Sequence, residues 1–79
     1  MKLKTALFLI EQERELQDKK WGIQNHAPEY WLGILGEEFG EVCKAVIEKD
    51  TVNHICEELI QVAAVATAFA QCIRKNERR

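Results

Sequence analysis

Two clusters of acidic and amide side chains lie inside hydrophobic patterns typical of helices, and their spacing can hold a divalent cation. The first reads Gly-Glu-Glu-Phe-Gly-Glu at residues 36–41, and the second reads Glu-Glu-Leu-Ile-Gln at residues 57–61. Residues three positions apart share one face of a helix, so Glu38 and Glu41 can point into the same space. Glu58 and Gln61 have this spacing on a second helix. Such oxygen ligands suit Mg²⁺, which also contacts substrate phosphates. The clusters therefore point to phosphate chemistry.

The same residues have a simpler interpretation. Acidic side chains at this spacing often lie on a solvated helix face, where Glu41 can pair with Lys44. Gly36 and Gly40 favour the metal-site interpretation over the solvated face. A glycine inside a helix costs about 1 kcal/mol of stability relative to alanine, so its presence indicates a local requirement that alanine does not meet. We therefore expect another backbone to approach closely at these two glycines.

The segment of residues 21–28 contains a glycine and the only proline, so we expect a loop that ends at the start of the next helix. Its side chains suit a nucleobase. Trp21 can stack on the ring, and Gln24 or Asn25 can hydrogen-bond to its polar edge. In the alternative interpretation Trp21 is a core anchor and His26 is a helix cap or a surface residue.

The hydrophobic pattern predicts an all-α chain with helices over about residues 3–19, 29–49 and 52–75. The first helix has two stripes whose apolar residues lie mainly toward the N-terminus. One consists of Leu3, Leu7, Ile10, Arg14 and Gln17, and the adjacent one of Ala6, Leu9, Glu13 and Leu16. Asp50 or Thr51 can cap the third helix, and we expect Tyr30 and Trp31 to be packing residues.

The third helix is apolar almost all round, so it needs burial on more than one side. A single chain of 79 residues forms one domain, residues 1–79, and buries only about 60–65% of its unfolded surface. We therefore expect a homo-oligomeric helical bundle, either a homodimer or a homotetramer.

The net charge and the cysteine content limit which classes of partner and which cellular compartment we expect. The 11 basic and 13 acidic residues give a net charge of −2, which leaves no electrostatic footprint for nucleic acid. Cys43, Cys56 and Cys72 have no Cys-x-x-Cys spacing, which is typical of small core residues in a reducing cytoplasm. The apolar run at residues 5–10 is too short for a signal peptide. No stretch approaches the roughly 20 apolar residues that span a bilayer, so we expect a soluble, cytoplasmic protein that binds no membrane.

Together these residues resemble the MazG-like nucleoside triphosphate pyrophosphohydrolases, also called the all-α NTP pyrophosphatases. The resemblance covers roughly residues 11–73. The family carries Glu-Glu-x-x-Glu on one helix, which residues 37–41 match in full. It carries Glu-x-x-Asp on the next, where residues 58–61 read Glu-Leu-Ile-Gln. Its members often place a Trp and then His-x-Pro ahead of the first motif, and Trp21, His26 and Pro28 hold these places.

The resemblance implies an enzyme that cleaves a nucleotide between its α- and β-phosphates, releasing a nucleoside monophosphate and pyrophosphate, with Mg²⁺ held by helix carboxylates. It implies Glu38, Glu41 and Glu58 as metal ligands, with Gln61 as the fourth. Glu37, the catalytic candidate beside Glu38, is a further ligand or orients the attacking water. The substrate-binding candidates are Trp21, Gln24, Asn25, His26 and Lys44.

Two departures from the family pattern weaken the enzyme hypothesis. Gln61 stands in place of the Asp, and its neutral carbonyl binds Mg²⁺ less strongly than a carboxylate; alternatively Gln61 forms a hydrogen bond between helices. The chain also stops soon after the third helix, where many relatives continue into a helix with basic residues. Lys44, Arg74, Lys75 or Arg78 can replace those residues, or are plain surface charges.

Three functions remain open. The leading hypothesis is a Mg²⁺-dependent pyrophosphohydrolase of (deoxy)nucleoside triphosphates that serves nucleotide pool sanitation. The second is a nucleotide-binding module that has lost turnover through Gln61. The third is a structural helical oligomer whose acidic clusters are solvated faces. Fold and motif do not identify the base, the sugar or the pathway.

Overall fold

Three helices make up the chain in this computed structural model, which describes residues 1–77. Helix α1 spans Leu3–Trp21, α2 spans Pro28–Ile47 and α3 spans Val52–Lys75. The described residues include no strand, so the all-α class and the three predicted helices are confirmed. Arg78, one of the candidate phosphate ligands, lies outside the described residues.

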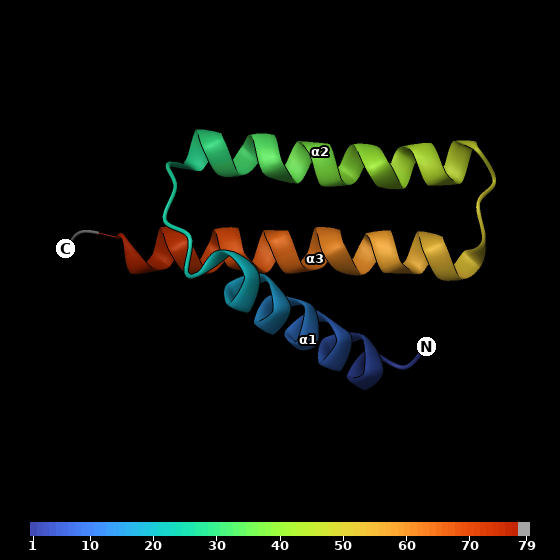
Figure 1. The fold of residues 1–79 in the computed structure, drawn as a ribbon, viewed down its shortest axis with the longest axis horizontal. Helices are drawn as coiled ribbons and strands as arrows, with labels where there is room; N and C mark the ends of the chain where they lie inside the picture. Colours follow the sequence, from blue (N-terminus) through green and yellow to red (C-terminus); the bar gives the residue numbers. More distant parts are fainter. Residues whose placement is uncertain (78–79) are drawn as a thin grey trace.

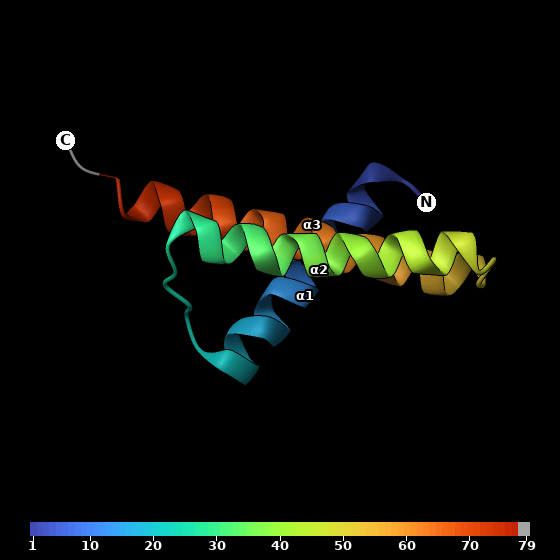
Figure 2. The same cartoon turned by 90° about the horizontal axis from the view of Figure 1, so that it is seen from above.

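The helices form an antiparallel pair with a third helix laid across it. Helices α2 and α3 run side by side in opposite directions, and α1 packs against α3 at a crossing angle (Figure 1). The view from above shows α1 passing obliquely beneath the pair (Figure 2). Both α1 and α2 therefore use α3 as their partner.

Three helix boundaries differ from the predicted ones because backbone conformation, not hydrophobicity, sets them. Helix α1 continues to Trp21, so this residue belongs to the helix and not to the loop. Gly22 then adopts a φ of 75° and its N–H donates to the carbonyl of Asp18 at 2.8 Å, which is a glycine C-terminal stop. Helix α2 begins at Pro28, which suits a first helical position, and ends two residues earlier than predicted. Lys49 has a φ of 57°, which a continuing helix does not allow.

The core lies where α2 meets the C-terminal half of α3. Its buried members are Trp31, Val65, Ala68 and Cys72, with Ile34, Leu35 and Phe69 packed against them. Trp31 is 3% exposed and its ring stacks on Phe69 with centroids 5.9 Å apart. The packing role expected for Trp31 is therefore confirmed. Tyr30, for which the same role is expected, is instead 61% exposed and stacks on His26.

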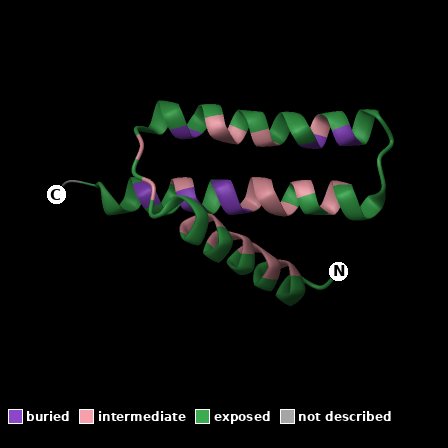
Figure 3. Ribbon diagram, viewed as in Figure 1, coloured by how far each residue is buried: buried purple, intermediate pink, exposed green. Residues whose placement is uncertain are grey.

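Much of each helix is exposed in the single chain (Figure 3). The exposed residues include many large apolar ones. Leu7, Leu32 and Phe39, among others, are each more than half exposed. A Cβ placed on Gly36 or Gly40 would meet no atom within 4 Å, so residues 1–77 do not make the close backbone approach expected at these glycines. This surface has no covering element among residues 1–77.

Helix α3 is long and apolar enough to cross a membrane by length and composition alone, with a mean hydropathy of 1.3 over its most apolar 18 residues. The uninterrupted apolar runs in the sequence are short, so we did not expect a helix that meets this membrane-span criterion. Core helices of soluble proteins meet the same criterion, and α3 is the helix on which both others pack.

The start of α3 offers a test of its local stability. Thr51 is the N-cap, and its Oγ1 accepts a hydrogen bond from the backbone N–H of His54 at 3.1 Å. We expect Thr51→Ala to lower the free energy of unfolding by about 1 kcal/mol, because that N–H loses its partner. Urea unfolding followed by circular dichroism measures the change. Thr51→Ser is the matched control, and an equal loss in both variants would mean that the hydroxyl cap contributes nothing.

Candidate functional site

A cleft of about 720 Å³ opens between α1, the loop of residues 22–27 and the α2–α3 pair. Five of the ten predicted site residues line it: Trp21, Gln24, Asn25, Glu38 and Gln61. Glu38 and Gln61 lie at one end, which we call the carboxylate end. Asn25 lies at the other end, the loop end, beside the C-terminal turns of α3. Gln61 and Lys75 both line the cleft and are separated by 14 positions on α3, so the cleft is about 21 Å long.

At the carboxylate end, Glu38 is half-buried on α2. Its pKa is raised above the usual value, first because burial disfavours the charged form and then because nearby carboxylates repel it. In decreasing order these carboxylates are Glu58, Glu41, Glu13 and Glu37. Acidic side chains from all three helices therefore act on one carboxyl group.

Glu58 has a partner that the sequence pattern does not indicate. Its Oε1 lies 3.2 Å from Nε2 of His54, one helical turn earlier. The other ring nitrogen of His54 lies 2.6 Å from Oδ2 of Asp50. The hydrogen bond and charge of Asp50, and to a smaller extent Glu58, raise the pKa of His54, while the same hydrogen bond lowers the pKa of Asp50. Protonated His54 thus neutralises part of the charge at Glu58.

The donor set at the carboxylate end has the right chemistry for a hard cation. Carboxylate oxygens and one amide carbonyl are the ligands that Mg²⁺ prefers, and a cation relieves the repulsion that raises the pKa of Glu38. Within residues 1–77 no three His, Cys, Asp or Glu side chains are arranged closely enough to hold a metal ion together. Glu37 and Glu41 are exposed on α2, and neither they nor Glu58 line the cleft.

At the loop end, aromatic and amide groups face the cleft. Trp21 is 63% exposed, and Nζ of Lys20 lies 4.9 Å from the centre of its ring. Oε1 of Gln24 lies 3.1 Å from Nε2 of His26. His26 itself packs edge-on against Trp31, with ring centroids 5.1 Å apart, and it lines a shallow hollow on the other side of the loop. His26 is therefore placed behind Gln24 and not in the cleft.

The loop is tied to the end of α3 by a small polar cluster. Oδ1 of Asn25 accepts hydrogen bonds from Nδ2 of Asn76 at 2.6 Å and from Sγ of Cys72 at 3.4 Å. The thiol of Cys72 also lies 3.6 Å from the carbonyl of His26. Asn25 thus holds the loop in place as well as lining the cleft.

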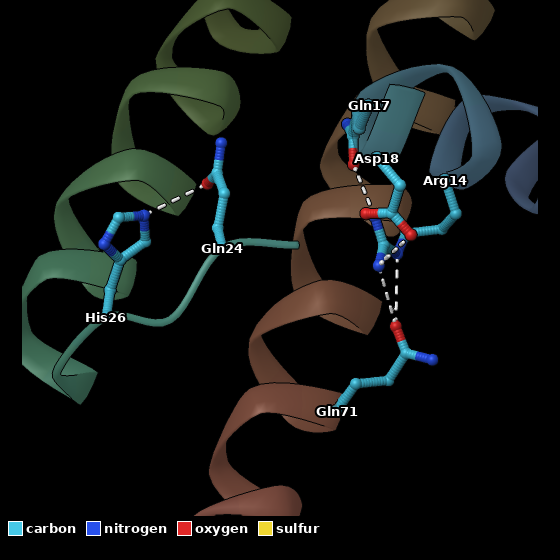
Figure 4. Close-up of polar contacts among 6 residues, drawn as sticks. All are labelled: Arg14, Gln17, Asp18, Gln24, His26 and Gln71. Atoms are coloured by element: carbon cyan, nitrogen blue, oxygen red, sulfur yellow. Dashed lines mark hydrogen bonds and ion pairs between the residues drawn. The ribbon is translucent and has the colours of Figure 1, made fainter. Parts of the chain in front are cut away.

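Arg14 links α1 to α3 across the cleft. Its guanidinium donates to Oε1 of Gln71 from Nε at 3.2 Å and from a terminal nitrogen at 3.0 Å. It also donates to Oε1 of Gln17 and forms an ion pair with Asp18 at 3.0 Å (Figure 4). This contact fixes the distance between the two walls.

The cleft contains basic and acidic residues that we do not predict from motifs. Glu13, Arg14 and Lys20 come from α1, and all line the cleft. The signal for Glu13 and Arg14 is present in the sequence, because both interrupt apolar stripes of the first helix. Lys75, a candidate for phosphate binding, also lines the cleft, whereas the exposed Lys44 in the last turn of α2 does not.

Comparisons of the whole chain with protein families, with curated proteins and with solved structures find no match.

The raised pKa of Glu38 predicts how stability depends on pH. Because folding favours the protonated carboxyl, the contribution is most favourable at low pH and is lost as the pH rises through the folded-state pKa. We expect Glu38→Gln to raise the Tm above that of the wild type at about pH 7.5, with the gain shrinking toward zero near about pH 4. Thermal unfolding across this range measures the difference.

Glu15→Gln is the control for this experiment. It removes the same charge as Glu38→Gln, but from an exposed position on α1. If both variants gain equally, the effect is one of net charge, and local repulsion at Glu38 is not its cause.

Proposed function

We propose that this protein is a Mg²⁺-dependent nucleotide pyrophosphohydrolase of the MazG-like kind, which converts a (deoxy)nucleoside triphosphate to the monophosphate and pyrophosphate. One observation carries the proposal: a single cleft has at one end Glu38, a carboxyl group repelled by nearby carboxylates, and at the other end aromatic and amide groups. A nucleotide has the same two-part chemistry, with polyphosphate at one end and an aromatic base at the other. The motif match at residues 37–41 supports the same assignment.

Glu38, Glu41, Glu58 and Gln61 are the residues proposed to hold the metal. When bound, Mg²⁺ supplies positive charge to the phosphate oxygens and favours deprotonation of water. Without a cation the carboxylates repel each other, as the raised pKa of Glu38 indicates. Glu37, exposed on the same helix, is proposed to orient the attacking water.

The remaining cleft residues bind and position the substrate. Arg14, Lys20 and Lys75 line the cleft and add positive charge that attracts a triphosphate, although Arg14 is also paired with Asp18. Trp21, exposed at the end of α1, offers a ring face for stacking on a base. Water attack on the α-phosphorus breaks the bond to the β-phosphate oxygen, so pyrophosphate leaves and the nucleoside monophosphate remains.

A homo-oligomer, a dimer or a tetramer, is the proposed working form. In support, many large apolar side chains are exposed in the single chain, including Leu32 and Phe39 on α2. The open space beside Gly36 and Gly40 on the same helix leaves room for the backbone of a second copy. A reducing cytoplasm is the proposed compartment, and the free thiols of Cys43, Cys56 and Cys72 agree with it.

A nucleotide-binding module without turnover is the second candidate, and two observations favour it. Gln61 lines the cleft as a neutral amide at the position where the family motif has a carboxylate. Glu58, a proposed ligand, already pairs with His54. Both features weaken a Mg²⁺ site relative to four unpaired carboxylates.

Pyrophosphate release from a panel of canonical and modified NTPs and dNTPs tests the function, with Mg²⁺ and with EDTA. We expect Mg²⁺-dependent release that Glu38→Gln lowers by about 100-fold or more, since even indirect partners of a metal are worth 10–100-fold. Glu15→Gln on exposed α1 is expected to keep the wild-type rate. Nucleotide-dependent stabilisation without pyrophosphate from any substrate would contradict the hydrolase and support the binding module.

A further inference from the structure

Four of the five amide side chains that line the cleft share one property that their sequence positions do not reveal, and Gln61 is the exception. Each of the four has its carbonyl oxygen occupied by a donor from within the chain. The oxygens of Gln17 and Gln71 accept from Arg14. The oxygen of Gln24 accepts from His26, and that of Asn25 accepts from Asn76 and Cys72. None of their four NH₂ groups has a hydrogen-bond partner within the part of the chain that the structure describes.

The orientation of these amides follows from their partners. An arginine has only donors, so it forces the oxygens of Gln17 and Gln71 toward itself. Figure 4 shows both oxygens turned to Arg14 and the oxygen of Gln24 turned to His26, with the amide nitrogens directed away. Because the oxygen of Gln24 can only accept, Nε2 of His26 must carry the proton in this contact.

The loop end therefore presents donors to whatever enters it. Gln24 and Asn25 offer uncharged NH₂ groups beside the ring of Trp21. The indole N–H of Trp31 also lacks an acceptor among residues 1–77, but this nitrogen is buried, so a ligand reaches it only if the neighbouring side chains move. A ligand group with its own donors leaves these groups unpaired, whereas a carbonyl oxygen accepts from them.

We propose that the loop end selects a nucleobase with a carbonyl in place of an exocyclic amino group, and that His26 acts as a positioning residue by fixing the amide of Gln24. This inference rests on the proposed function, because it takes a nucleotide as the ligand with its phosphates at the carboxylate end. Uncharged donors next to an aromatic ring suit a base carbonyl. Lys20, over the ring of Trp21, and Lys75, near the end of α3, line the same end of the cleft and add charged donors to it. The purine and the pyrimidine keto bases share this chemistry.

Matched pairs of ligands isolate the exocyclic group. The probes are the α,β-imido analogues of dITP and dATP, and of dUTP and dCTP, which resist cleavage at the reacting bond. Calorimetric titration of the full-length protein with Mg²⁺ gives Kd for each. Every probe carries the same polyphosphate, so the ratio of Kd values within a pair reports the base alone. We expect the keto member to bind about tenfold more tightly in at least one pair, and the pair that responds identifies purine or pyrimidine.

Two variants test the residues named. Gln24→Met keeps the size of the side chain but removes its donor, and His26→Phe keeps the ring that packs on Tyr30 and Trp31 but frees the amide of Gln24. We expect each to bring the keto-to-amino ratio to within about twofold of unity. Gln12→Met is the matched control, since Gln12 is exposed on α1 outside the cleft. A merely structural role for His26 would weaken all four probes and leave the ratio unchanged.

The outcomes separate this inference from the proposed function. Equal binding of keto and amino bases, a preference for amino bases, or a keto preference that survives Gln24→Met would overturn the inference while nucleotide binding still stood. Keto preference without pyrophosphate release from the natural nucleotides would support the inference and contradict the hydrolase. Binding of none of the probes would overturn both.

Discussion

The packing of both other helices against α3 is the constraint on which the rest of the structure depends. Helix α3 is apolar almost all round, and its small residues Ala64, Ala68 and Cys72 are buried. Trp31 from α2 fills the space that these small side chains leave. Because α1 crosses α3 instead of lying beside α2, the three helices enclose a cleft on one side. The same arrangement brings Glu13, Glu38 and Glu58 within electrostatic reach of one another.

Polar contacts then give the cleft its chemistry. Arg14 spans α1 and α3, and the cluster of Asn25, Cys72 and Asn76 ties the loop to the end of α3. These contacts use up acceptors and leave donors exposed at the loop end, while carboxylates dominate the carboxylate end. The repulsion between carboxylates around Glu38 is the reverse of what stability alone favours, and such perturbed groups cluster at functional sites.

Much of the architecture was accessible from the sequence, because hydrophobic periodicity and capping residues act locally. The positions of the three helices, the cap at Thr51 and the burial of Trp31 follow from such patterns. The end of α1 did not, since Gly22 and its left-handed backbone stop the helix one residue after Trp21. Tyr30 illustrates another limit: its neighbour Trp31 faces α3 and is buried, whereas Tyr30 points to solvent and meets His26.

For the site, the sequence by itself determined which residue types are available and which of them share a helix face, because the helical repeat fixes that spacing. It placed Glu38 and Gln61 as candidates, and both line the cleft. Only the tertiary structure decided that Glu13 joins them from α1 and that Arg14 of α1 pairs with Gln71 of α3. The physical reason is that the crossing of α1 over α3 and the choice of hydrogen-bond partner depend on side chains distant in sequence. A local pattern does not contain that information.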